Sequence, residues 1–167
     1  MRLPEQSASE FQKYVHWVYS GDVDLKPNSK EEPTSEAADQ SWQECLDLYF
    51  LADFVQDKAL ANRVMEVLVY LCAEYSSGLE EGLFDASQLK IVYERTVTGS
   101  PLRKLVVDYT LEQVCSSSFA QQAEYYPQEF VQEMATRAFK TLREAGVVVT
   151  GTQALQSTYY EAEDDSE

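Results

Sequence analysis

The sequence has one histidine, three widely separated cysteines and no glycine-rich nucleotide loop. The cysteines, Cys45, Cys72 and Cys115, are odd in number and not closely spaced, so they suit neither a disulfide framework nor a zinc knuckle. His16 is the single imidazole, and a catalytic triad or a zinc quartet is therefore not favoured. Neither a Walker loop nor a G-x-G-x-x-G loop is present, which leaves nucleotide chemistry unsupported. We expect no catalytic centre, no cofactor and no metal site.

Long apolar runs and basic residues are also scarce. The longest apolar run, residues 67–73, has seven residues, whereas a membrane helix needs about 18 to 20. The amino terminus has neither an apolar core nor an arginine-rich character, so it resembles neither a secretory signal nor a transit peptide. Only 13 basic residues oppose 29 acidic ones, and the net charge of -16 repels nucleic acid and anionic lipid. We expect an intracellular protein of the cytoplasm or nucleus, with no nucleic-acid or membrane partner.

What the sequence does contain is apolar residues at helical spacing, and 44% of its 167 residues are hydrophobic. That composition can support one folded domain, or a small domain with a helical extension. The first helix is predicted to bury a stripe formed by Phe11, Val15 and Val18, which lie at the i, i+4 and i+7 positions. Gly21 suits the left-handed position that ends this helix, and Val23 and Leu25 alternate as in a short strand.

Residues 26–40 contain two prolines and no large apolar side chain, which indicates a disordered loop. Ser41 and Glu44 form an S-x-x-E pattern, which predicts a helix start there. Two apolar stripes between residues 45 and 71, with a break near Gln56 and Asp57, indicate an antiparallel helix pair.

The carboxy-terminal half is also predicted to be helical. A helical segment covers residues 87–94, and Ser100 with Pro101 then suits the N-cap and first position of the next helix. Pro127 suits the first position of a last helix that ends near Gly146, with Phe130, Met134 and Leu142 facing inward. We divide the chain into a first part at residues 1–78, a helical extension at 79–146 and an acidic tail at 147–167. We expect the tail to be disordered, because five of its last seven residues are acidic.

Two sequence segments together suggest a family. The segment FQKYVHWVYSGDV, followed after a loop by CLDLYFLADFVQDKALANRVMEVL, resembles the second half of a BTB/POZ domain. The segment VYERTVTGSPLRKLVVDY is similar to the region that often follows this domain in BTB-like proteins of filamentous fungi. The matching positions are Phe11, Tyr14, Trp17, Tyr19 and Gly21, then Leu48, Leu51, Ala52 and Asp53, then Ser100, Pro101, Leu102 and Arg103.

The resemblance implies a mainly α-helical, non-catalytic protein-interaction module with at most one short strand. The implied partners are other proteins, such as a cullin, for which many BTB proteins act as ubiquitin ligase adaptors, or another BTB protein. Because Met1 stands almost directly before the first motif, the family's amino-terminal strands and helices have no counterpart. The usual BTB homodimer is therefore in doubt, and a truncated remnant or regulator that pairs with full-length BTB proteins is the alternative.

Three groups of residues allow a structural and a functional interpretation. The aromatic residues Tyr14, Trp17 and Tyr19 suit a core more than a recognition surface, and His16 suits a surface or packing role. Acidic pairs such as Glu80 with Glu81 lack the ordered spacing of a calcium loop. The helix pair from residue 41 to 73 has a wide apolar circumference, so we expect an incompletely covered apolar surface on it.

Overall fold

The computed structural model describes residues 8–23, 25, 35–75 and 84–146. Within these ranges the chain forms seven α-helices and one short 3-10 helix, and no strand. The helices are α1 (Ala8–Ser20), α2 (Ser35–Val55), α3 (Lys58–Tyr75), α4 (Ala86–Arg95), α5 (Pro101–Gln113), α6 (Ser116–Gln122) and α7 (Gln128–Glu144), with η1 (Ala123–Tyr125) before α7. The predicted helical class is confirmed. Val23 and Leu25 are both buried, and the Leu25 amide donates to the Val23 carbonyl at 3.1 Å in a tight turn.

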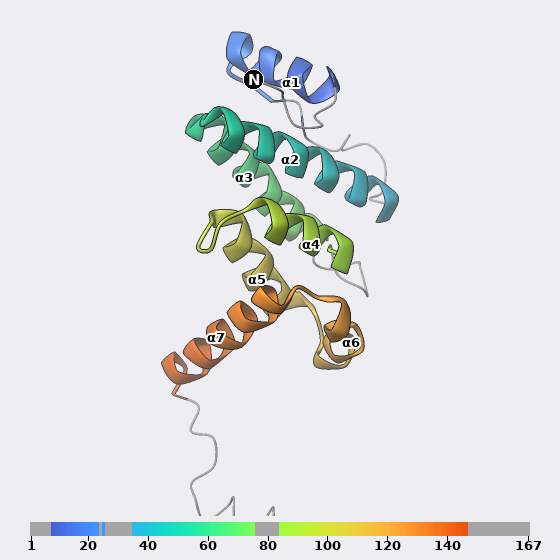
Figure 1. The fold of residues 1–167 in the computed structure, drawn as a ribbon, viewed down its shortest axis with the longest axis vertical. Helices are drawn as coiled ribbons and strands as arrows, with labels where there is room; N and C mark the ends of the chain where they lie inside the picture. The colour runs from blue at the N-terminus through green and yellow to red at the C-terminus, as the bar shows by residue number, and fades with distance from the viewer. Residues whose placement is uncertain (1–7, 24, 26–34, 76–83, 147–167) are drawn as a thin grey trace, which may run out of the picture.

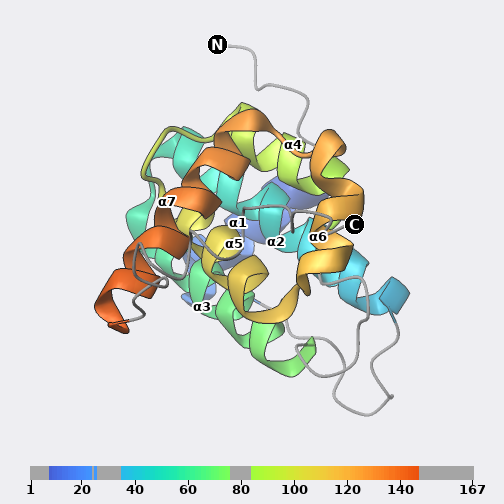
Figure 2. The same ribbon diagram turned by 90° about the horizontal axis from the view of Figure 1, so that it is seen from below.

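The helices are stacked along the long axis of the molecule (Figure 1). Helix α1 lies at one end, α2 and α3 form the next pair, and α4 and α5 follow. Helix α5 packs on α3, α4 and α7, and in the view along the stack it lies near the centre, with α7 crossing in front of it (Figure 2). The carboxy-terminal end of α7 projects away from the other helices in both views.

A continuous hydrophobic core joins the first helix pair to the extension. The ring of Trp42 on α2 lies 4.1 Å from that of Phe84, and Phe84 lies 4.8 Å from Tyr109 on α5. Leu68 on α3 and Val106 on α5 are fully buried in the same cluster. The helices of residues 84–146 therefore pack on those of residues 35–75 through shared aromatic and aliphatic contacts.

The turn between α2 and α3 lies where the sequence predicts a break. Gln56 has a φ of 58°, and its amide donates to the Asp53 carbonyl while the Asp57 amide donates to the Ala52 carbonyl. This is the hydrogen-bond pattern of a Schellman motif, in which a left-handed residue ends a helix. The Asp57 carboxylate then accepts the Leu60 amide at 3.0 Å, and this contact caps the start of α3.

Four details of the predicted helices are wrong. Residues 35–40 belong to α2, because SEAADQ has no proline or glycine to interrupt the helix. Ser41 consequently lies inside α2 rather than at its start. Pro127 is the N-cap of α7, one residue before the position that we predicted. Leu142 is 40% exposed, because the end of α7 extends beyond its neighbours. Residues 26–34 and the tail at 147–167 lie outside the described residues.

Candidate functional site

The second group of matching positions, Leu48, Leu51, Ala52 and Asp53, lies on α2, and its apolar members belong to the core. Leu48, Leu51 and Ala52 on α2 are buried, whereas Asp53 is exposed and its carbonyl takes part in the turn that ends α2. These positions hold α2 against its neighbours. Among the side chains that the structure describes, the large apolar residues exposed on this helix pair are Phe54 and Val55 at the end of α2 and Val69 and Tyr70 on α3.

The first group of matching positions, from Phe11 to Gly21, is divided between two sides of α1. Tyr14 and Trp17 are half-buried and pack against the core, and the Trp17 Nε1 donates to Asp57 Oδ2 at 3.2 Å. On the same side, the Lys13 ammonium lies 2.7 Å from Glu44 on α2. Gly21 ends the helix with a φ of 68°. His16 is exposed. Trp17 and Lys13 therefore attach α1 to the pair formed by α2 and α3.

The other side of α1 carries exposed apolar side chains, which we call the α1 stripe. Its members are Phe11, Val15, Val18 and Tyr19, with exposed fractions of 50%, 37%, 58% and 88%. The prediction that Phe11, Val15 and Val18 face the core is therefore wrong. Their spacing places them together on the helix, but the aromatic residues beside them occupy the contact with α2. Tyr19 is likewise not a core residue.

The GSPLR segment builds the start of α5. Ser100 is the N-cap, and its hydroxyl accepts the Arg103 amide at 3.3 Å. Pro101 is the first residue of the helix, and Leu102 is fully buried in the core. The predicted cap is confirmed. Ser100, Pro101 and Leu102 thus place the fourth residue, Arg103, at the contact between three helices.

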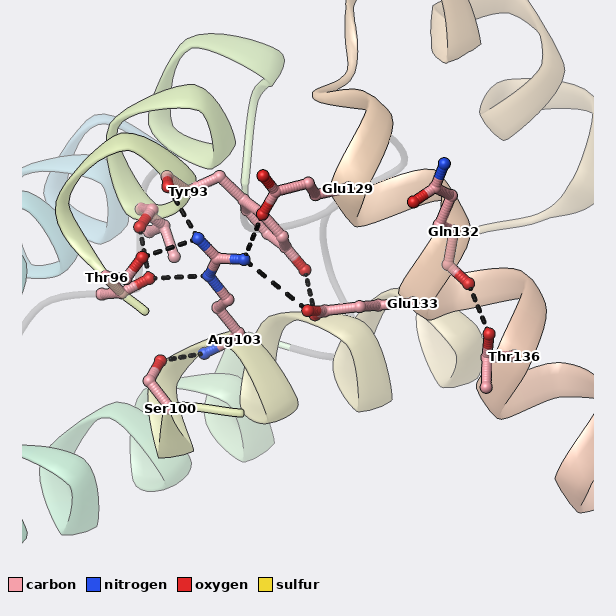
Figure 3. Close-up of polar contacts among 9 residues, drawn as sticks. Tyr93, Thr96, Ser100, Arg103, Glu129, Gln132, Glu133 and Thr136 are labelled. Atoms are coloured by element: carbon pink, nitrogen blue, oxygen red, sulfur yellow. Dashed lines mark hydrogen bonds and ion pairs between the residues drawn. The ribbon is translucent and has the colours of Figure 1, made fainter. Parts of the chain in front are cut away.

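Arg103 is only 4% exposed and lies where α4, α5 and α7 meet (Figure 3). Its Nε donates to Thr96 Oγ1 at 3.0 Å, and its Nη2 donates to the carbonyls of Tyr93 and Thr96 at 2.8 and 2.6 Å. These carbonyls belong to the end of α4, where backbone acceptors lack helical partners. Nη1 donates to Glu129 at 2.5 Å and lies 3.7 Å from Glu133, both on α7.

Tyr93 completes this cluster. The Arg103 guanidinium carbon lies 4.3 Å from the centre of the Tyr93 ring, a cation–π distance. The Tyr93 hydroxyl donates to Glu133 at 2.6 Å. Burial, followed by this bond to a carboxylate, raises the pKa of Tyr93 well above its usual value. The cluster connects α4, α5 and α7, and its donors and acceptors are occupied by one another.

A groove of about 640 Å³ opens beside the Arg103 cluster, between α5, α7 and the loop after α4. Glu129 and Glu133 line it near Arg103, and Lys104, Arg137 and Lys140 are also among its lining residues. None of these three basic residues was predicted from the sequence. For Arg137 and Lys140 the signal was the basic series at residues 137, 140 and 143, whose spacing of three places the side chains along neighbouring turns of one helix. Lys104 lies outside that series.

No group of three or more His, Cys, Asp or Glu side chains in the described ranges could hold a metal ion. Cys45 and Cys72 are buried, and this burial raises the pKa of each thiol to about 12. Cys115 is exposed, and hydrogen bonds with the hydroxyls of Ser117 and Ser118 lower its pKa to about 7. No helix in the described ranges is long and apolar enough to cross a membrane.

The chain was compared with protein-family models, curated proteins and solved structures, and no significant match was found in any of the three.

Proposed function

We propose that this chain is a non-catalytic protein-interaction module of the BTB/POZ type that binds a partner protein through the α1 stripe. The observation that carries the proposal is the exposure of Phe11, Val18 and Tyr19 on the helix at the end of the stack. Soluble proteins rarely leave contiguous apolar side chains in water unless they bind something. Phe and Tyr are, in addition, residue types enriched at the centres of protein interfaces.

The placement of α1 supports this proposal. Tyr14 and Trp17 hold the helix on the stack from one side, so a partner can contact the stripe without displacing α1. A helix presenting apolar side chains at i, i+4 and i+7 fits a groove or a second helix in a partner. The net charge of -16 favours a protein partner over nucleic acid or a membrane surface. The place of action is inside the cell, in the cytoplasm or nucleus.

The partner that we put first is a cullin, so that the chain would act as a substrate adaptor of a ubiquitin ligase. The second candidate is a complete BTB domain, with which the chain would pair as a regulator. The α1 stripe does not separate the two roles, because it lies in the segment that resembles the BTB family and either partner could contact it. A binding assay with each purified partner separates the two roles.

The test uses the full chain immobilised against a cullin amino-terminal domain or against a complete BTB domain. We expect Val15→Ser combined with Val18→Ser to weaken binding at least tenfold, which corresponds to about 1.4 kcal/mol. Both side chains are exposed, so the thermal melt should change little. The matched control is Val97→Ser, an exposed valine in the loop after α4, which should leave binding unchanged.

Each outcome decides between the candidates. Suppose that the wild type binds the BTB domain but not the cullin, and that the Val15→Ser, Val18→Ser variant loses this binding. The regulator role would then replace the adaptor role. Equal binding by the wild type and the α1 variant would show that the stripe is not the interface. If neither domain binds, both roles are wrong.

A further inference from the structure

The groove between α5 and α7 has an uneven distribution of charge. At one end Glu129 and Glu133 are engaged by the buried Arg103. The other charged residues of its lining are Lys104 and Asp108 on α5 and Arg137 and Lys140 on α7. Asp108 is paired with Arg137 at 2.7 Å, and Glu144 lies 3.8 Å from Lys140 with both side chains largely exposed, a pair that contributes little. Basic charge therefore exceeds acidic charge among these residues.

A group of three basic side chains is unusual in a chain with 29 acidic and 13 basic residues. An acidic ligand that arrives from solution meets the repulsion of the whole molecule before it reaches the groove. An acidic segment of the same chain meets the groove at the high effective concentration that a covalent tether provides. Charge complementarity thus favours a ligand from this chain over a separate acidic partner.

Residues 159–167, with the sequence YYEAEDDSE, have this chemistry. They contain two tyrosines and five carboxylate side chains. Twelve residues, 147–158, separate Gly146 from Tyr159 and can span up to roughly 40 Å. The 17 residues of α7 measure only about 25 Å. The length of the chain therefore allows this segment to reach any part of the groove along α7.

We propose that residues 159–167 bind in the groove between α5 and α7 of the same molecule. Their carboxylates pair with Lys104, Arg137 and Lys140, and a tyrosine ring contacts the aliphatic parts of the side chains that line the groove. Bound in this way, the segment competes with any other acidic ligand for the groove. This proposal is independent of the α1 stripe, which lies at the opposite end of the helix stack.

The test compares amide NMR spectra of the full chain and of a full-length variant with a neutral tail, Glu161→Gln, Glu163→Gln, Asp164→Asn, Asp165→Asn and Glu167→Gln. We expect resonances of residues 98–108 and 136–140 to shift, and those of α1 to stay in place. A second full-length variant, Lys104→Gln with Lys140→Gln, keeps the wild-type tail. The resonances of its tail should shift relative to those of the wild-type protein. The matched control, Glu31→Gln with Glu32→Gln, removes acidic charge elsewhere in the chain and should leave the groove resonances unchanged.

Two results would overturn the proposal. Unchanged groove resonances in the neutral-tail variant would mean that the tail does not occupy the groove. Shifts that disappear when the wild-type protein is diluted would mean that the tail binds a second molecule rather than its own.

Discussion

At the scale of single residues, Arg103 concentrates several contacts in one side chain. Its guanidinium donates to two carbonyls at the end of α4, to a threonine hydroxyl and to a carboxylate on α7. A lysine has one ammonium in place of this planar set of donors and cannot reproduce the arrangement. The side chain therefore joins three helices through directional hydrogen bonds, in addition to the core contacts of those helices.

Replacing Arg103 should destabilise the protein strongly. Arg103→Ala leaves the carbonyls of Tyr93 and Thr96 without this donor, and we expect the free energy of unfolding to fall by about 3 kcal/mol. Arg103→Lys should cost less because it keeps the charge. Urea unfolding followed by circular dichroism measures both. The control is Arg137→Ala, whose pair with Asp108 is 44% exposed on each side and should cost less than about 1 kcal/mol. Equal losses at the two arginines would contradict this account.

The three cysteines should differ in reactivity. Cys115 is exposed with a pKa of about 7, whereas Cys45 and Cys72 are buried with pKa values of about 12. Because the thiolate is the nucleophile, alkylation of the folded protein should occur at Cys115 alone, and its rate should rise with pH around a midpoint near 7. Mass spectrometry after iodoacetamide treatment measures this rate.

Removing the hydroxyls of Ser117 and Ser118 tests the cause of the lowered pKa. Ser117→Ala with Ser118→Ala should move the midpoint of the Cys115 alkylation rate upward, because the bonds that favour the thiolate are lost. An unchanged midpoint would assign the reactivity of Cys115 to its exposure alone.

At the scale of helices, Asp57 links α1 to the turn between α2 and α3. One carboxylate oxygen accepts the Leu60 amide at the start of α3, and the other accepts Trp17 Nε1 from α1. Asp57→Ala should therefore cost about 2 kcal/mol, about 1 for the lost cap and about 1 for the lost bond to Trp17. Thermal and urea unfolding measure the loss.

Asp85→Ala is the matched control for Asp57→Ala. Asp85 caps α4 by accepting the Gln88 amide at 2.7 Å, and its loss should cost only about 1 kcal/mol. If the two substitutions cost the same, the bond between Trp17 and Asp57 contributes nothing measurable.

Helices with local signals could be predicted from the sequence. Ser100 and Pro101 identify the start of α5, and the break at Gln56 and Asp57 separates α2 from α3, because caps and turns depend on neighbouring residues. Residues 35–40 were misassigned, since a polar helical turn has no apolar periodicity. Periodicity grouped Phe11, Val15 and Val18, but it could not say that α2 would contact Tyr14 and Trp17 instead. The burial of Arg103 also depends on α7, whose Glu129 lies 26 residues further along the chain.

At the scale of the whole molecule, α1 is attached differently from the other helices. It packs on one side only, at the end of the stack, and Trp17 and Lys13 supply its polar contacts to α2 and the turn after it. Helices α2 to α5 lie instead within the continuous core. Elements with few buried contacts open at lower free energy than the rest of a protein, so α1 should be the first helix to open.

Hydrogen exchange should resolve this difference. Amides of α1 should exchange faster than those of α2, α3 and α5. Trp17→Phe removes a hydrogen bond worth about 1 kcal/mol, so it should raise the exchange rate of the α1 amides several-fold and leave that of the α5 amides unchanged. Exchange followed by mass spectrometry measures each helix in one experiment. Uniform acceleration across all helices would mean that α1 opens only with the whole protein.

The two tryptophans of the chain lie in contrasting surroundings. Trp17 is half-buried beside a carboxylate on α1, whereas Trp42 is fully buried against Phe84. Their emission should consequently differ in wavelength and in access to a soluble quencher. The protein thus carries two intrinsic fluorescent reporters, one for the release of α1 and one for the loss of the core, and Trp17→Phe or Trp42→Phe would isolate either signal.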